Sequence, residues 1–242
     1  REAIGREKAG IFRRGRPAVV AEPDPPQSVL SADAQLLLIG RDFGYANQGS
    51  QWSWWGPSGK RSGLAHPALR GAVQLSNASA ALAALDALAT RLPVAMQDIR
   101  RGLLEVDLPG RFQMLPGRPT VVLDVAHNPQ AARALADSLG RQYAPATWAV
   151  FGMLRDKDIA AVIREMTGRV THWLPCTLHG PRATDAAELA RILVAQGVPG
   201  PLPEFASPAV AFRHARENAG EDDRILAFGS FLTVAEVLRA AS

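Results

Sequence analysis

The sequence predicts an α/β protein whose second half is a mostly parallel β-sheet covered by helices. From residue 111 onward, segments typical of strands and of helices alternate along the chain. Residues 120–125 form a short apolar run rich in β-branched residues, as expected for a strand buried on both faces. Asp124 lies at the end of this run, and Asn128 and Pro129 after it suit the N-cap and first position of a helix.

Residues 1–107 show a less regular mixture of strands and helices. Residues 1–16 are interpreted as the last turns of a helix through Lys8, stopped by Gly10. Pro109 and Gly110 break the pattern and mark a domain boundary after residue 107. The other elements expected in this part are a strand at 17–21, a turn at 23–26, a helix near 28–35, a β-rich region at 36–64 with a tryptophan hairpin, and helices at 71–90 and 96–106.

The second half predicts strand–helix units in order. Strands are expected at 120–125, 146–151, 170–174 and 225–228, with a weaker candidate at 202–205, and helices at 130–142, 159–167, 186–196, 209–218 and 232–240. Each of the four main strands runs into a polar or glycine-rich turn, and such turns meet along one edge of a parallel sheet. One rim therefore carries Asp124, His127, Lys157, Arg182 and Ser230. Each has a structural explanation alone, as a helix cap or surface charge, but together they indicate a binding site.

Composition excludes several classes of protein. A chain of 242 residues with 47% hydrophobic content can form two domains with real cores. The net charge of +4 is spread along the sequence, without the basic, aromatic-rich stripe of a nucleic-acid binder. Cys176 is the only cysteine, which favours a reducing compartment and a cytoplasmic protein. No apolar run approaches the roughly 18 residues of a membrane span. The start at Arg1 suggests a chain cut from a longer one.

Familiar catalytic motifs are missing, which narrows the chemistry. A phosphate loop at 56–62 would need glycine at Trp54 and serine or threonine at Arg61, so this segment is interpreted as a turn. There is no G-x-G-x-x-G, no zinc-site spacing and no G-x-S-x-G. The remaining features are rim cations, a helix N-terminus that favours anions, and an acid able to accept bonds from ribose hydroxyls. This set suits a nucleotide and a small anionic substrate.

Six segments carry a resemblance to a known family. They are E-K-A-G-I-F-R at 7–13, L-P-G-R-F-Q at 108–113, L-D-V-A-H-N-P at 123–129, F-G-M-L-R-D-K-D at 151–158, G-P-R-A-T at 180–184 and F-G-S-F-L-T-V-A at 228–235. In this order they closely resemble the bacterial bifunctional dihydrofolate synthase/folylpolyglutamate synthases, which are related to the Mur ligases. The resemblance implies that residues 1–107 end a Mur-ligase-type ATP-binding central domain, and that residues 108–242 form a Rossmann-like, mostly parallel glutamate-ligase domain.

The resemblance also implies an activity. A carboxylate of dihydropteroate or of a reduced folate is phosphorylated by MgATP, and the amine of L-glutamate attacks the acyl phosphate. By resemblance, the cofactors are ATP and Mg²⁺, and a monomer is expected. Site roles are implied for seven residues: Arg111 at the ATP phosphate, Asp124 at the ribose, Asn77 at the nucleotide, His127, Arg182 and Ser230 at glutamate, with His127 also catalytic, and Lys8 as an N-carboxylated lysine that helps organise magnesium.

Three features of the family are not in this sequence. Its phosphate loop, its magnesium-binding acid and histidine, and its pterin-binding segment all belong upstream of E-K-A-G-I. The chain by itself is therefore expected to have negligible ligase activity. Two alternatives remain open: a Mur-type ligase of peptidoglycan synthesis, and a non-catalytic remnant that only holds nucleotide or glutamate.

Overall fold

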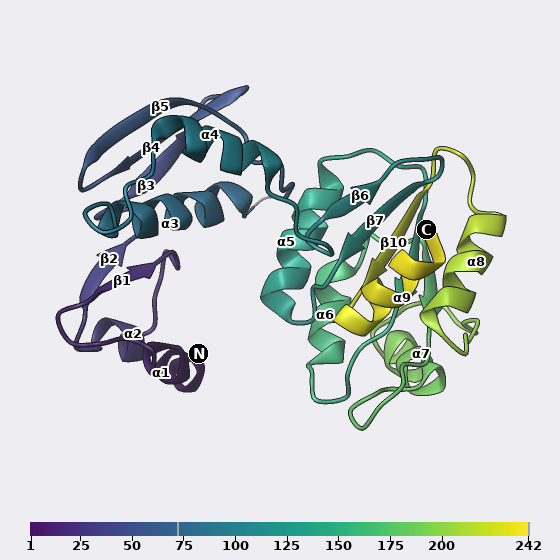
Figure 1. The fold of residues 1–242 in the computed structure, drawn as a ribbon. Helices are drawn as coiled ribbons and strands as arrows, with labels where there is room; N and C mark the ends of the chain where they lie inside the picture. The colour runs from purple at the N-terminus through teal and green to yellow at the C-terminus, as the bar shows by residue number, and fades with distance from the viewer. Residues whose placement is uncertain (72, 242) are drawn as a thin grey trace. The chain divides into compact units, whose positions relative to one another are not determined.

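The computed structural model describes residues 1–71 and 73–241. The chain divides into two compact units (Figure 1). Residues 1–68 and 73–107 form the first, and the second contains residue 108 onward together with a short segment that begins at Leu69. None of the described helices is long and apolar enough to cross a membrane.

The first unit contains two small sheets packed with helices. Strands β1 and β2 pair in parallel, and β3, β4 and β5 form an antiparallel meander. Its core gathers Trp52, Trp54 and Phe43 against Leu82 and Ile99 of the two longer helices. The elements are α1 (Glu2–Ala9), β1 (Pro17–Val20), α2 (Gln27–Leu30), β2 (Gln35–Leu38), β3 (Gly44–Asn47), β4 (Gln51–Gly56), β5 (Gly59–Ala65), α3 (Gln74–Ala87) and α4 (Met96–Glu105). Residue 72, inside the helix expected at 71–90, lies outside the described residues.

The segment that superficially resembles a phosphate loop is a hairpin turn, as expected. Strand β4 ends at Gly56 and β5 begins at Gly59. The Asp86 carboxylate accepts the Ser58 backbone N–H at 3.1 Å and forms an ion pair with Arg61 at 3.1 Å. These contacts attach the hairpin to α3. Gly56, Gly59 and Arg61 therefore have structural roles in the hairpin.

The helix predicted near 28–35 is shorter in the structure. Helix α2 covers only Gln27–Leu30, and Gln35 begins a strand. The Ser31 hydroxyl donates to the Gln27 carbonyl at 2.9 Å, so it satisfies a carbonyl at the helix end. Residues 35–38 then pair in parallel with residues 17–20, and this pairing outweighs the local preference for helix.

The second unit is a five-stranded sheet of order β6-β7-β10-β8-β9. All neighbouring strands are parallel except β6, a short antiparallel edge strand that the sequence pattern did not predict. The elements are β6 (Gln113–Leu115), β7 (Thr120–Asp124), α5 (Pro129–Gly140), β8 (Thr147–Phe151), α6 (Ile159–Met166), β9 (His172–Pro175), α7 (Ala186–Ala195), α8 (Pro208–Asn218), β10 (Arg224–Phe228) and α9 (Phe231–Ala241).

Helices cover both faces of this sheet. On one face Val122 and Leu226 pack with residues of α5, α6 and α7. On the other, Val121 and Ile225 pack with residues of α8 and α9. Figure 1 shows α5 beside α6, and α8 beside α9. Because both faces are buried, the central strands are continuously apolar, which explains why their pattern could be recognised from sequence.

The weak strand expected at 202–205 does not form. Only Phe205 makes a bridge, to Cys176, with its N–H donating to the Pro175 carbonyl at 3.0 Å. Pro201 and Pro203 lack the backbone N–H that a strand ladder requires. The segment therefore runs beside β9 without extending the sheet.

Asp223 joins the start of β10 to the start of β8. Its carboxylate accepts the Gly220 N–H at 2.8 Å, the Ala146 N–H at 3.1 Å and the Trp148 indole N–H at 3.1 Å. The Gly220 N–H contributes most to lowering the pKa of Asp223 below its ordinary value. In the folded protein the ionised form is therefore favoured.

Replacing Asp223 with asparagine should lower the free energy of unfolding at pH 7 by about 1–2 kcal/mol, since the charged acceptor of these bonds is lost. The folded-state pKa of Asp223 is below the unfolded one, so its contribution is present above about pH 4 and is lost as pH falls through the folded value. Denaturant unfolding between pH 2 and 7 should show a weaker acid dependence for D223N.

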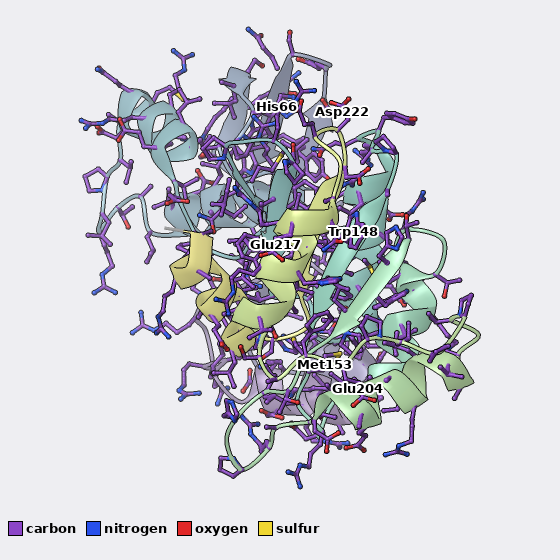
Figure 2. All side chains as sticks on the ribbon, turned by 90° about the vertical axis from the view of Figure 1, so that its right-hand side faces the viewer. His66, Trp148, Met153, Glu204, Glu217 and Asp222 are labelled. Atoms are coloured by element: carbon purple, nitrogen blue, oxygen red, sulfur yellow. The ribbon has the colours of Figure 1, made fainter. Side chains whose placement is uncertain are left out.

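The neighbouring Asp222 provides a matched control. Its carboxylate pairs with the exposed Arg118 guanidinium, and both side chains are largely solvated. Figure 2 marks Asp222 and Trp148 on this part of the second unit. Asp222→Asn should change the unfolding free energy by less than about 0.5 kcal/mol. Equal losses for both variants would contradict the assigned role of Asp223.

Candidate functional site

The polar turns of the second unit lie at one edge of its sheet. Strands β7, β10, β8 and β9 are parallel neighbours, so their carboxyl ends share an edge. In Figure 2, Trp148 near the start of β8 and Met153 just after its end mark the direction of the strands. The turns at this edge contain residues 125–128, 229–230, 152–158 and 176–185. This arrangement is the one expected of a ligand site in an open α/β sheet.

Gly229 sets the distance between the turns after β10 and β8. Its φ is +105°, and a Cβ atom there would lie 2.6 Å from the Gly152 carbonyl oxygen and 2.7 Å from Met153 Cγ. The Thr233 hydroxyl donates to that same carbonyl at 2.9 Å. These contacts fix where the N-terminus of α9 meets the rim.

Asp124 fastens the loop that carries Arg111. One carboxylate oxygen accepts the Phe112 N–H at 2.9 Å and the other accepts the Ala126 N–H at 2.8 Å. Burial raises the pKa of Asp124 above its ordinary value, and the two backbone hydrogen bonds and the Arg111 charge partly offset this rise.

The backbone on both sides of Arg111 has an unusual conformation. Gly110 has φ +73° and Phe112 has φ +45°, which is uncommon for a residue with a side chain. The Gly110 carbonyl accepts the Val125 N–H at 2.9 Å, and its N–H donates to the Gln113 side chain at 3.1 Å. The structure therefore maintains a strained turn at the rim, and strain of this kind concentrates at functional sites.

Arg111 lies over the ring of Phe231. The guanidinium carbon is 5.7 Å from the ring centroid, within the range of a cation–π interaction. Phe231 is the first residue of α9 and is 59% exposed. The cation is thus held at the rim while remaining open to solvent.

His127 lies at the start of α5. Its Nδ1 is 2.8 Å from the Val125 carbonyl oxygen, so Nδ1 carries the proton and Nε2 is the acceptor in the neutral ring. Asn128 caps α5 by accepting the Ala131 N–H at 2.9 Å, and Pro129 follows as predicted. His127 therefore presents Nε2 as an acceptor beside a helix N-terminus.

Ser230 is buried before the first turn of α9. Its hydroxyl oxygen accepts the Leu232 N–H at 3.2 Å, and its carbonyl accepts the Val234 N–H at 3.1 Å. This is the capping arrangement that the sequence suggested.

Lys157 and Arg182 meet at one carboxylate. Asp156 Oδ2 lies 3.1 Å from Lys157 Nζ and 3.5 Å from an Arg182 guanidinium nitrogen. The hydrogen bond from Lys157 is the main cause of the lowered pKa of Asp156. The Arg155 side chain donates to the Ala183 carbonyl at 3.1 Å and ties the two turns together. This cluster brings two cations and one carboxylate together at the far end of the rim.

Lys8 and Asn77 belong to the first unit. Lys8 is exposed on the last turn of α1, and Asn77 is exposed on the first turn of α3, where its amide donates to the Gln74 side chain at 3.1 Å. Within the second unit, Arg111 lies near the Asp124 carboxylate, and Lys157 and Arg182 both lie beside the Asp156 carboxylate. Across residues 1–71 and 73–241, no group of three or more His, Cys, Asp or Glu side chains is arranged to hold a metal ion.

A match to a protein-family model shows the family to which the chain belongs. The model for the Mur ligase, glutamate ligase domain matches residues 110–231, which contain the whole rim. The chain belongs to the Mur ligase family. Within this Mur ligase domain, the matched segment begins at the Gly110 turn and ends at Phe231.

Individual relatives agree with this family assignment. The chain is 39% identical over 246 residues to the dihydrofolate synthase/folylpolyglutamate synthase of Escherichia coli K12, covering 98% of the chain and 55% of that protein. It is 33% identical to the protein of the same name from Haemophilus influenzae, covering 98% of the chain and 58% of that protein. The chain thus spans a little over half the length of these curated relatives.

Solved structures have the same fold. The E. coli FolC complex with DHPP and ADP superposes with a TM-score of 0.90 at 37% identity, over 99% of the chain and 56% of FolC. The Yersinia pestis bifunctional enzyme complexed with AMPPNP and Mn superposes with a TM-score of 0.87 at 40% identity, over 99% and 56%. These matches confirm the α/β fold with its Mur ligase domain.

Sequence reasoning missed two features of this Mur ligase domain. Phe231 was quoted only as part of the segment F-G-S-F-L-T-V-A and was given no role. Asp156 was not recognised as the residue that unites Lys157 and Arg182. The signals were present, since Phe231 follows the capping Ser230 and Asp156 lies between two cations in R-D-K.

Proposed function

We propose that this chain contributes the glutamate-ligase part of an ATP-dependent ligase that joins L-glutamate to dihydropteroate and to tetrahydrofolate through an acyl phosphate. The observation that carries this proposal is the match of a glutamate ligase family model to the unit whose rim gathers Arg111, Asp124 and His127. Residues 1–107 would then end the ATP-binding central domain, and residues 108–242 would form the glutamate-ligase domain. The buried, unbridged Cys176 agrees with a cytoplasmic enzyme.

The nucleotide would be held by Arg111, Asp124 and Asn77. The exposed guanidinium of Arg111 offers planar donors suited to phosphate oxygens. Each oxygen of Asp124 accepts one backbone N–H and retains a lone pair for a ribose hydroxyl. The exposed amide of Asn77 would add a contact from the first unit. These residues fit the polar groups of a nucleotide.

Glutamate would be held by Arg182, Ser230 and His127. The Arg182 side chain is 65% exposed beside Asp156, so it can pair with a carboxylate of the amino acid. His127 offers Nε2 as an acceptor for an ammonium or amine proton. Ser230 would contribute its position at the N-terminus of α9, which favours an anion.

The described residues do not by themselves form a complete magnesium site. We propose Lys8 as the carboxylated lysine because its amine is exposed to solvent on α1. Carboxylation would turn its positive charge into a negative one that could help organise magnesium. A Y. pestis relative was solved with Mn and AMPPNP, which agrees with a nucleotide–metal cofactor.

The reaction would depend on positioning and charge neutralisation. The phosphoryl group transferred to the substrate carboxylate carries negative charge that Arg111 would stabilise. His127 would then orient the glutamate amine, or take its proton, as the amine attacks the acyl carbon and inorganic phosphate leaves. Residues of this chain would thus act both in phosphoryl transfer and in the attack of the amine on the acyl phosphate.

The test is ADP release on the full-length product of the gene, beside the 242-residue chain, with dihydropteroate, L-glutamate and MgATP. Activity that requires dihydropteroate and glutamate in the full-length protein, and is absent from the chain alone, is expected. UDP-linked peptide substrates replace dihydropteroate to test a Mur-type peptidoglycan ligase. Inactivity of the full-length protein with both substrates would favour a non-catalytic binding remnant.

A further inference from the structure

We propose that Phe231 is a positioning residue that holds the Arg111 guanidinium ready for a nucleotide phosphate. The identity of the anion rests on the function proposed above. The pairing of the two side chains rests on the structure of the second unit alone.

The location of Phe231 is not explained by packing of the core. Helix α9 buries Thr233, Val234 and Val237 against the sheet, whereas Phe231 remains 59% exposed at its first turn. An aromatic ring left in solvent at a helix start gains little from burial. Its described aromatic contact is with Arg111, whose guanidinium carbon lies 5.7 Å from the ring centroid.

The backbone that carries Arg111 is fixed on both sides. Gly110 is fitted closely enough that a Cβ would lie 2.8 Å from Val125 Cγ1, and Phe112 is buried and bonded to Asp124. The remaining freedom lies in the long Arg111 side chain, which has several rotatable bonds. The ring of Phe231 restricts that freedom and so lowers the entropy lost when an anion binds.

An aromatic partner leaves the guanidinium available for an anion. The ion pairs of the described residues include Arg61 with Asp86 and Arg133 with Glu165, in which a carboxylate occupies the donors, but they do not include Arg111. A ring face attracts the cation without accepting its in-plane N–H groups, so these donors and the net charge remain for phosphate. Phe231 therefore orients Arg111 without competing with the ligand.

The test compares Phe231→Leu, which removes the ring, with Phe231→Tyr, which retains it, in the full-length gene product. F231L should weaken ADP binding measured by calorimetry and raise the KM for ATP by about two- to five-fold, with a smaller change in kcat. F231Y should behave like the unmodified protein. Tyr143→Leu, at an aromatic residue that is 93% exposed, is the matched control and should leave the ADP affinity unchanged.

A double-mutant cycle gives a readout that a merely structural role would not change. In an Arg111→Met background, F231L should cause no further loss of ADP affinity, because the partner is already gone. The proposal would be overturned if F231L lowered the ADP affinity of R111M as much as it lowers that of the unmodified protein. It would also be overturned if F231L alone bound ADP as tightly as the unmodified protein does.

The pairing can also be tested without nucleotide. The Arg111 side-chain N–H resonance, assigned by its disappearance in R111M, should shift in F231L and stay near its place in F231Y because the ring current is lost only in the former. A shift in a protein that fails to bind ADP would support the pairing and contradict the nucleotide assignment. No shift in F231L would overturn the pairing itself.

Discussion

Replacing Arg111 with methionine in the full-length gene product should lower kcat/KM for ATP by roughly 100- to 1,000-fold, the loss typical of removing one preorganised donor to developing charge. Arg111 is exposed and its backbone is held by bonds that the substitution does not touch, so the unfolding free energy should change little. Steady-state kinetics with ATP varied at saturating dihydropteroate and glutamate would measure the effect, and thermal unfolding would verify the fold.

Two further variants define the cause of that loss. Arg111→Lys keeps the charge but not the planar fork, so it should recover only part of the activity. Arg213→Met removes an exposed arginine of α8 and should leave kcat/KM unchanged. A decrease of less than about tenfold in R111M, or an equal decrease in R213M, would contradict the proposed contact between Arg111 and phosphate.

The strand–turn–helix units were predictable because their causes are local. The apolar run 120–124 must be buried on both faces, Asp124 ends it, and Asn128 with Pro129 starts the next helix. Parallel pairing of the strands then brings these turns to one edge of the sheet, and this does not depend on the other side chains of the strands. The rim could therefore be predicted from sequence, along with most of its polar residues.

The bonds made by those residues could not be predicted in the same way. Asp124 is predicted to face a ribose, and the structure shows that it accepts the Phe112 N–H across a turn in which Phe112 has positive φ. No local preference indicates positive φ for phenylalanine, since this conformation depends on the surrounding contacts. The same holds for the short helix α2, whose end depends on the pairing of the flanking strands β1 and β2 and not on the helix residues alone.

Replacing Gly229 with alanine should lower the free energy of unfolding by about 2–5 kcal/mol. An alanine at φ +105° costs about 1–2 kcal/mol because of its backbone conformation. A Cβ placed 2.6 Å from the Gly152 carbonyl oxygen and 2.7 Å from Met153 Cγ adds an overpacking cost of about 1–3 kcal/mol. Denaturant unfolding of both proteins would measure the difference.

Gly168→Ala separates the two costs. Gly168 also has positive φ, +78°, but a Cβ there would meet nothing within 4 Å. It should therefore show the conformational cost alone, and a loss in G229A no larger than in G168A would refute the close-contact argument. Relief of the Gly229 clash requires the turn to move away from Gly152, which would displace Ser230 and Phe231 at the start of α9. In the full-length gene product, G229A should consequently lower the proposed ligase activity even under conditions where the protein remains folded, because the rim geometry depends on this contact.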